Sequence, residues 1–393
     1  MFLKIHSDMK KAYKSILLLT LAIALAGIYS SCKKSDSLPN NGQPVINYVR
    51  STNPTVSDSL LVAANQGNLI AIMGENLGGT VEVWFNDQKA LLTPTYVTNT
   101  TIMVSVPNPI PTVITNKLKL VFANGQTLLY PFNVTISKPV ITSMNCEYVA
   151  TGDVALIRGD FFYPPLTVTF AGGAIGTLVS LDSKNIMVTI PAGAQPGQIT
   201  VHTNFGDTKS NFWFRDNRNI VVSSDPYTGW WNASFVVTSP GPGDPPAING
   251  NYIRVKQFVG GWGWMEVCGG PSSAMGAISQ NIPDEAILKP ELYNLKFEVN
   301  TMKPYNGNNL VLNFGLLDAS NGNNNAYNWK PPFDTQGKWQ TVVIAFDDMV
   351  KAYGAPLVLS STGYYCRVLF FGPGDLNCDM SFDNFRIVPK VIK

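Results

Sequence analysis

Most of the chain consists of short runs in which apolar and polar residues alternate, separated by Gly, Pro and Asn. Residues 66–87, QGNLIAIMGENLGGTVEVWFND, and residues 151–172, TGDVALIRGDFFYPPLTVTFAG, each hold two such runs. Alternation at period two sends successive side chains to opposite faces of a strand, so each run can bury one face. The pattern predicts an all-β protein with many short strands.

The same two segments are copies of each other. Gly67 and Phe85 of the first match Gly152 and Phe170 of the second at one constant offset. Each copy holds several short strands split by turn residues, which is typical of a small Greek-key sandwich. We therefore expect two tandem immunoglobulin-like sandwiches.

The composition changes after Asp216, because six of the eight Trp lie beyond it. About eight candidate strands follow, and they fit a two-sheet jelly roll, a further β-sandwich. Glu298 alternates with apolar neighbours and is expected to face solvent, whereas Trp339 opens a strand and is expected in the core.

A secretory signal precedes these domains. Three lysines come before the apolar run 15–32, which ends in Ser30-Ser31-Cys32, and this order of basic, apolar and small residues is typical of a signal peptide. The ending resembles the lipobox of bacterial lipoproteins, which implies that Cys32 is lipidated after cleavage; an uncleaved membrane anchor is the alternative. The polar segment that follows predicts a flexible tether. The expected order is a signal peptide (residues 1–32), a tether (33–43), a first sandwich (44–136), a second sandwich (137–216) and a C-terminal β-sandwich (217–393).

The charges and the histidines exclude several classes of function. Charged residues make up 14% of the chain and the net charge is +2, with no basic cluster, which argues against nucleic-acid binding. Beyond the signal, His202 is the one histidine, so hydrolase triads and His-based metal centres have no basis. We assign no catalytic residue, no metal ligand and no cofactor. Cys146, Cys268, Cys366 and Cys378 fit no zinc spacing and are expected to be buried free thiols.

Aromatic residues of the last domain indicate a binding surface instead. In NNNAYNWKPPF, residues 323–333, Tyr327 and Trp329 stand among Asn and Pro, and Tyr305 stands in a similar polar loop. A pyranose packs its flat CH face on an aromatic ring, while neighbouring amides hydrogen-bond its hydroxyls. Because large rings outside a core mark recognition surfaces, Trp329, Tyr327 and Tyr305 are candidate glycan-binding residues.

Three closely spaced aromatic pairs add further candidates. In GGWGW, Trp262 and Trp264 share one face of a strand; we expect Trp264 in the core and take Trp262 as a candidate for the ligand surface. Of the neighbours Tyr364 and Tyr365, Tyr364 is the candidate for exposure. The adjacent pair Trp230-Trp231 points to opposite faces, so one of the two is expected to be buried.

Several motifs resemble known families. The opening PVI, the core G-x-x-V/L-x-I-x-G-x-x-F/L and the strand I-x-V-x-V/I-P each occur twice and are similar to IPT/TIG immunoglobulin-like domains. INGNYIRV, GWGW, LKFEVNT, YNWKPP and GKWQTVVIAF together resemble the B-type surface glycan-binding proteins of Bacteroidota. The resemblance implies a lipoprotein on the surface of the outer membrane, whose spacer domains carry a C-terminal glycan-binding domain. It also implies a plant β-glucan such as xyloglucan as ligand, a TonB-dependent transporter as partner, and platform aromatics at Tyr305 and Trp329.

Two other functions remain open. Paired carboxylates beside the aromatic loops would favour a polysaccharide-cleaving enzyme. Asp383 lies in a strand that often closes such jelly rolls, where an acidic residue is expected to be structural and is sometimes a calcium ligand. A flat apolar patch without polar neighbours would favour a protein-binding adhesin.

Overall fold

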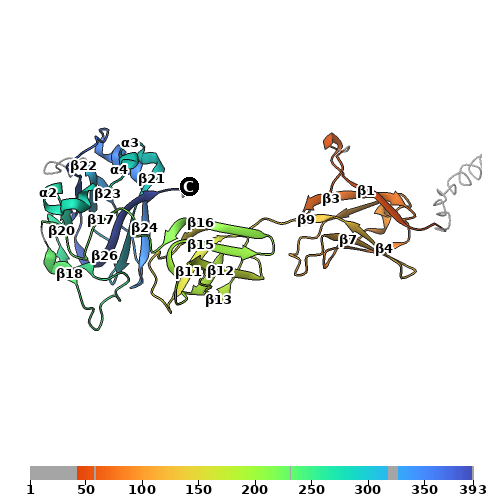
Figure 1. Cartoon of the computed structure of the whole chain (residues 1–393), viewed down its shortest axis with the longest axis horizontal. Coiled ribbons are helices and arrows are strands. Elements are labelled where there is room, and N and C mark those ends of the chain that lie inside the picture. Colours follow the sequence, from red (N-terminus) through yellow and green to blue (C-terminus); the bar gives the residue numbers. More distant parts are fainter. Residues whose placement is uncertain (1–41, 57–58, 231, 317–325, 392–393) are drawn as a thin grey trace, which may run out of the picture. The chain divides into compact units, whose positions relative to one another are not determined.

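The structure is a computed structural model that describes residues 42–56, 59–230, 232–316 and 326–391. The chain forms two compact units that divide after Ile136. Both are built from strands joined by loops and a few short helices (Figure 1). The predicted all-β class is therefore confirmed. In the part of the chain that the structure describes, no helix has the length and apolar character needed to cross a membrane.

The first unit is a sandwich of two antiparallel sheets with an additional parallel pair of strands. Ile72 and Val83 come from opposite sheets and are fully buried between them. Phe85 and Phe132 meet edge to face there, with ring centroids 5.8 Å apart. One sheet has the order β1 (Val45–Ser51), β3 (Leu69–Glu75), β6 (Thr101–Ser105), and the other has the order β5 (Gln88–Lys89), β4 (Thr80–Phe85), β7 (Lys117–Phe122), β8 (Thr127–Pro131). The parallel pair consists of β2 (Ala63–Asn65) and β9 (Asn133–Thr135). Two 3-10 helices, η1 (Pro54–Val56) and η2 (Pro94–Tyr96), lie in the loops.

The second unit begins with another sandwich of the same kind. Its sheets have the orders β10 (Val140–Met144), β11 (Val154–Asp160), β14 (Asn185–Thr189), β13 (Thr177–Leu181) and β12 (Leu166–Ala171), β15 (Gln195–Thr203), β16 (Gly206–Phe214). The structure gives a reason for one repeated glycine. A Cβ on Gly74 would lie 2.0 Å from the carbonyl oxygen of Val45, and one on Gly159 would lie 1.8 Å from that of Val140. Both copies need glycine there because the backbones approach too closely for any side chain.

The C-terminal domain packs two further sheets face to face. Val255, Phe297 and Phe382 of one sheet meet Phe314 and Val368 of the other in a single buried core. The first sheet has the order β18 (Val236–Val237), β19 (Tyr252–Val259), β26 (Leu376–Pro389), β21 (Tyr293–Thr301), β24 (Gln340–Ala345), and a sixth strand, β17 (Ile220–Val222), pairs with β26. The second sheet has the order β20 (Met265–Gly270), β25 (Tyr365–Phe370), β22 (Leu310–Leu316), β23 (Tyr327–Trp329). Helices are α2 (Ser272–Met275), α3 (Asp284–Leu288), α4 (Phe346–Tyr353), η3 (Ala233–Phe235), η4 (Gly276–Gln280) and η5 (Pro290–Leu292).

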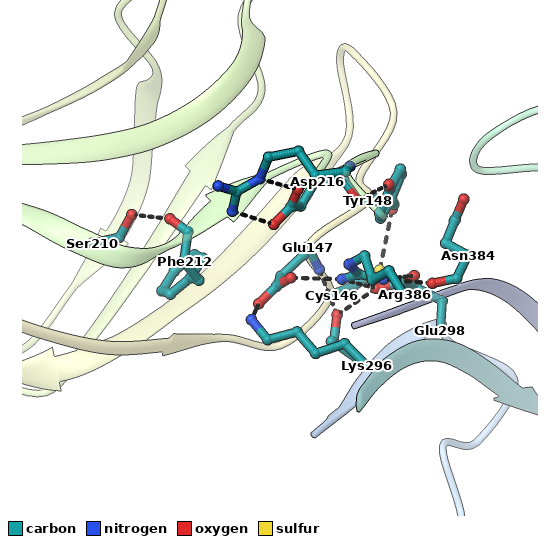
Figure 2. Close-up of polar contacts among 12 residues, drawn as sticks. Cys146, Glu147, Tyr148, Ser210, Phe212, Asp216, Lys296, Glu298, Asn384 and Arg386 are labelled. Atoms are coloured by element: carbon teal, nitrogen blue, oxygen red, sulfur yellow. Dashed lines mark hydrogen bonds and ion pairs between the residues drawn. The ribbon is translucent and has the colours of Figure 1, made fainter. Parts of the chain in front are cut away.

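A buried ionic network joins the second sandwich to the C-terminal domain. Figure 2 shows Glu147, from the loop after β10, between Lys296 and Arg386. Its carboxylate lies 2.6 Å from Lys296 Nζ and 2.6 Å from Arg386 Nη2. The other side of Arg386 contacts Glu298 Oε2 at 2.8 Å. Thr341 links the two acids, because its hydroxyl accepts the N–H of Glu147 and donates to Glu298.

The expectation that Glu298 faces solvent is wrong. Its side chain does lie on the face of β21 opposite the core, as the alternation requires, but the second sandwich covers that face and Glu298 is fully buried. Burial raises the pKa of Glu298, and Arg386 acts in the opposite direction. Trp339 is buried as expected. The four cysteines Cys146, Cys268, Cys366 and Cys378 are free and buried, which confirms that expectation.

Candidate functional site

Trp329 and Tyr327 do not form an exposed platform. In the register of β22 and β23, Trp329 pairs with Leu310 and Tyr327 with Leu312, and both leucines are fully buried in the core. The two aromatic side chains therefore lie on the inner face of edge strand β23, where they are partly buried. The Trp329 ring contacts those of Phe297, Tyr305 and Phe333 at centroid distances of 5.7, 5.2 and 4.9 Å.

Tyr305 and Tyr364 are also wrong as exposed candidates, because both are buried. The Tyr305 hydroxyl accepts the N–H of Leu310 at 2.8 Å and donates to the carbonyl of Trp329 at 2.6 Å. The Tyr364 hydroxyl accepts the N–H of Ser360 at 3.2 Å. Each phenol satisfies backbone groups of a polar loop that folds over it, so polar neighbours in the sequence did not mean exposure.

Three other tryptophans are exposed, and we call Trp230, Trp262 and Trp264 the tryptophan row. Their exposed fractions are 50%, 64% and 46%. Trp262, a candidate for the ligand surface, is exposed, whereas the core position expected for Trp264 is wrong. Both rings contact Phe371, with centroids 5.5 and 5.6 Å apart. Trp231 lies outside the described residues.

A strained turn presents Trp262 at the start of β20. Its φ is 60°, a left-handed conformation that is unfavourable for a bulky side chain. Two hydrogen bonds hold the turn: the Trp262 N–H donates to the carbonyl of Gly372 at 2.7 Å, and the Gly261 N–H donates to Asp375 Oδ1 at 2.8 Å. Strain of this kind persists only where the surroundings impose it, and it is often found at functional sites.

Trp264 is fixed by an ion pair beneath it. Its indole N–H donates to Glu266 Oε1 at 2.7 Å, and the Arg367 guanidinium lies 4.7 Å from the ring centroid in a cation–π contact. Arg367 Nε donates in turn to Glu266 Oε2 at 2.8 Å. The ring orientation is therefore set by the protein itself, which lowers the entropy lost when a ligand binds.

Trp230 lies beside the other end of the same strand. Its N–H donates to the carbonyl of Gly269 at 3.0 Å, and a Cβ on Gly270 would approach Trp230 Cγ to 3.3 Å. The Asn232 side chain hydrogen-bonds the carbonyl of Glu266, so residues on both sides of position 231 follow the edge of β20. The row thus extends over the length of β20, about 20 Å at 3.3–3.4 Å per residue.

This arrangement suits a flat, uncharged and extended ligand. Three exposed indoles offer apolar faces along one strand, and the ionic groups beside them, Glu266 and Arg367, neutralise each other. Polar groups for hydroxyl recognition are close, since Asp375 anchors the turn of Trp262. An extended sugar chain matches these features better than an ion or a compact metabolite.

Catalytic and metal-binding groups do not gather at this row. Glu266 is held by both Arg367 and Trp264. His202 lies on the second sandwich, where it pairs with Asp207 at 3.0 Å. Across the described ranges, no three His, Cys, Asp or Glu side chains come together as a metal-ligand cluster.

Comparison with known proteins places the row within a recognised domain. Residues 214–389 match the family described as surface glycan-binding protein B xyloglucan binding domain. An IPT/TIG domain-containing protein of Bacteroides ovatus is 33% identical over 139 residues, which are 34% of this chain and 28% of that protein. The matched segment thus spans well under half of that relative.

Two solved structures are similar over most of their length. The surface glycan-binding protein PbSGBP-B of Prevotella bryantii is 23% identical, with a TM-score of 0.66 over 89% of this chain and 99% of that one. SGBP-B from a complex xyloglucan utilization locus in Bacteroides uniformis is 19% identical, with a TM-score of 0.47 over 88% and 100% of the two chains. The first likeness supports the fold of tandem sandwiches and a C-terminal β-sandwich.

Proposed function

We propose that the chain is a B-type surface glycan-binding protein and that it binds a xyloglucan-type β-glucan along the tryptophan row. The observation that carries this proposal is the exposure of Trp230, Trp262 and Trp264 beside one edge strand, β20, of the domain that matches the family. The other aromatic candidates are less exposed, since Tyr305 and Tyr364 are buried and Tyr327 and Trp329 are partly buried.

We propose a non-catalytic role at this site. A glycosidase needs two carboxyl groups on either side of the scissile bond, one of them free to take up and release a proton. The carboxylate nearest to Trp264 is Glu266, and its oxygens are bound by Arg367 and by the indole N–H. A group committed to positioning a ring supports binding rather than hydrolysis.

The first test separates the two units. Residues 137–391 are expected to bind xyloglucan as tightly as residues 42–391, and residues 42–136 are expected not to bind, because the row lies in the second unit. Isothermal titration calorimetry with xyloglucan oligosaccharides measures this directly. Affinity electrophoresis with galactomannan and with an acidic pectin provides the controls. Comparable binding by residues 42–136, or preferential binding of pectin, would contradict the proposal.

We also propose that the protein is anchored to the outer membrane by lipid on Cys32 and presents glycan to a TonB-dependent transporter. Cys32 lies outside the described residues; the proposal rests on the apolar run that ends there and on the resemblance. Cys32→Ala is expected to yield unprocessed precursor or released protein, since cleavage and acylation both need the thiol. Membrane fractionation with an immunoblot checks this, and a variant that stays membrane-bound at mature size would refute the anchor.

A further inference from the structure

Small polar residues occupy the centre of the outer face of the six-stranded sheet. Asn300 and Ser381 stand opposite each other on the neighbouring strands β21 and β26, and Glu298 stands opposite Asp383 one step along. All four are buried, Asn300 and Ser381 completely. They therefore form one contiguous polar group on a covered face.

Two aromatic rings close over this group. Tyr252 starts β19 and Trp339 immediately precedes β24, and in the order β19-β26-β21-β24 these strands are three spacings, about 14 Å, apart. Their ring centroids are nevertheless only 5.5 Å apart, at an interplanar angle of 79°. The rings must therefore reach over β26 and β21 to meet.

The loop before β19 holds both rings in place. The Tyr252 hydroxyl donates to the carbonyl of Pro245 at 2.7 Å, and the Trp339 indole N–H donates to that of Pro246 at 2.8 Å. Cys146 and Tyr148 of the second sandwich pack against the same two rings. The two rings therefore cover a buried polar floor that consists of Asn300, Ser381, Glu298 and Asp383.

Three oxygen atoms of this floor have no hydrogen-bond partner within the described residues: Asn300 Oδ1, Ser381 Oγ and Asp383 Oδ2. The Asn300 amide nitrogen donates to the carbonyl of Gly337 at 2.8 Å, which turns Oδ1 the other way. The second oxygen of Asp383, Oδ1, accepts the N–H of Asn384 at 2.8 Å. Buried oxygens are costly when unpaired, so three adjacent ones indicate a ligand.

The cations near this floor form their ion pairs with other carboxylates. Arg386 is shared between Glu298 and Glu147, and Lys296 pairs with Glu147. On the next row of the sheet, Arg254 is shared by Asp379 and Asp244.

We propose that Asn300, Ser381 and Asp383 bind a calcium ion beneath the rings of Tyr252 and Trp339. A carboxylate, an amide oxygen and a hydroxyl are the hard oxygen ligands that calcium takes, with water completing its coordination. A divalent ion would neutralise Asp383 and satisfy the two neutral oxygens at once. It would also tie β21 to β26 directly beneath the junction with the second sandwich, so its role would be structural and independent of glycan binding.

The test uses residues 33–393 after dialysis against EDTA and then against chelator-free buffer. Calcium at 100 times its Kd is expected to raise the melting temperature by roughly 5–10 °C. Mass spectrometry of the metal content should give one calcium per chain, and magnesium or sodium at the same concentration should give a smaller shift.

Two variants locate the ion. Asp383→Asn keeps the shape of the side chain and is expected to lose both the bound calcium and the thermal response, while Asp348→Asn, on the exposed face of α4, keeps both. If Asp383→Asn does not fold, Ser381→Ala, which removes one neutral ligand, should weaken the calcium response at least tenfold in concentration. A wild-type chain without calcium and without a thermal shift would overturn the proposal, as would a normal response from the Asp383 and Ser381 variants.

Discussion

Replacing Glu147 with alanine is expected to lower the free energy of unfolding of residues 137–391 by about 3–5 kcal/mol. Glu147 is buried and is bound on one side by Lys296 and on the other by Arg386, which is itself fully buried. Removing the carboxylate leaves Lys296 as a buried cation without its partner and leaves Arg386 with Glu298 alone. The loss is large because neither cation can regain water without opening the junction between the two domains.

Chemical denaturation followed by tryptophan fluorescence measures this change. Asp348→Ala is the matched control, because Asp348 also pairs with a lysine of the same unit, Lys351, but both side chains are exposed on α4. Exposed pairs contribute about 0–1 kcal/mol. The double variant Glu147→Ala/Lys296→Met should recover part of the lost free energy of unfolding, since it also removes the buried cation that Glu147 had paired. Equal effects of Glu147→Ala and Asp348→Ala would mean that the junction does not stabilise the unit.

This network gives the second sandwich a part in folding that the repeat alone did not suggest. The sequence showed Glu147 only as one residue of a loop, and it showed Arg386 and Lys296 only as charges within strands. Long-range pairing of this kind depends on which domain faces cover each other. Neither period-two alternation nor turn chemistry contains that information.

The fold itself was predictable because it follows from local sequence patterns. Gly74 and Gly159 recur at matched positions since the chain approaches its own backbone there in both copies. Apolar alternation in β21 correctly separated Leu295, Phe297 and Val299 from the opposite face. These signals depend on neighbours in sequence, so tertiary structure does not alter them.

The binding surface was harder to predict, because exposure depends on which strand is left at an edge. Polar neighbours around Trp329 suggested a loop, but Asn328 and Trp329 alternate on a strand, and the register sends Trp329 inward. The spacing of Trp262 and Trp264 predicted a shared strand face, but both residues precede β20, and their rings lie on one face only in that both contact Phe371. It did not reveal that this face stays open, since that requires β20 to be the edge strand of its sheet.

Trp264→Ala is expected to weaken xyloglucan binding by about 5- to 150-fold, the equivalent of about 1–3 kcal/mol for an aromatic hot spot. The ring is pre-oriented by Glu266 and Arg367 and exposes 46% of its surface, so its loss removes a ready-made stacking face. Little stability should be lost, because half of the ring already contacts solvent. Calorimetry gives the affinity, and the melting temperature of the same sample reports the fold.

Trp329→Ala is the matched control for this prediction. Its ring packs against Phe297, Tyr305 and Phe333, so truncation should cost about 3 kcal/mol of stability. The fraction that stays folded should bind with the parent affinity, because Trp329 faces the core rather than the ligand. The two variants therefore separate binding from folding in opposite directions. If Trp264→Ala binds like the parent while Trp329→Ala loses affinity at unchanged stability, the glycan lies at β23 and the tryptophan row is not the site.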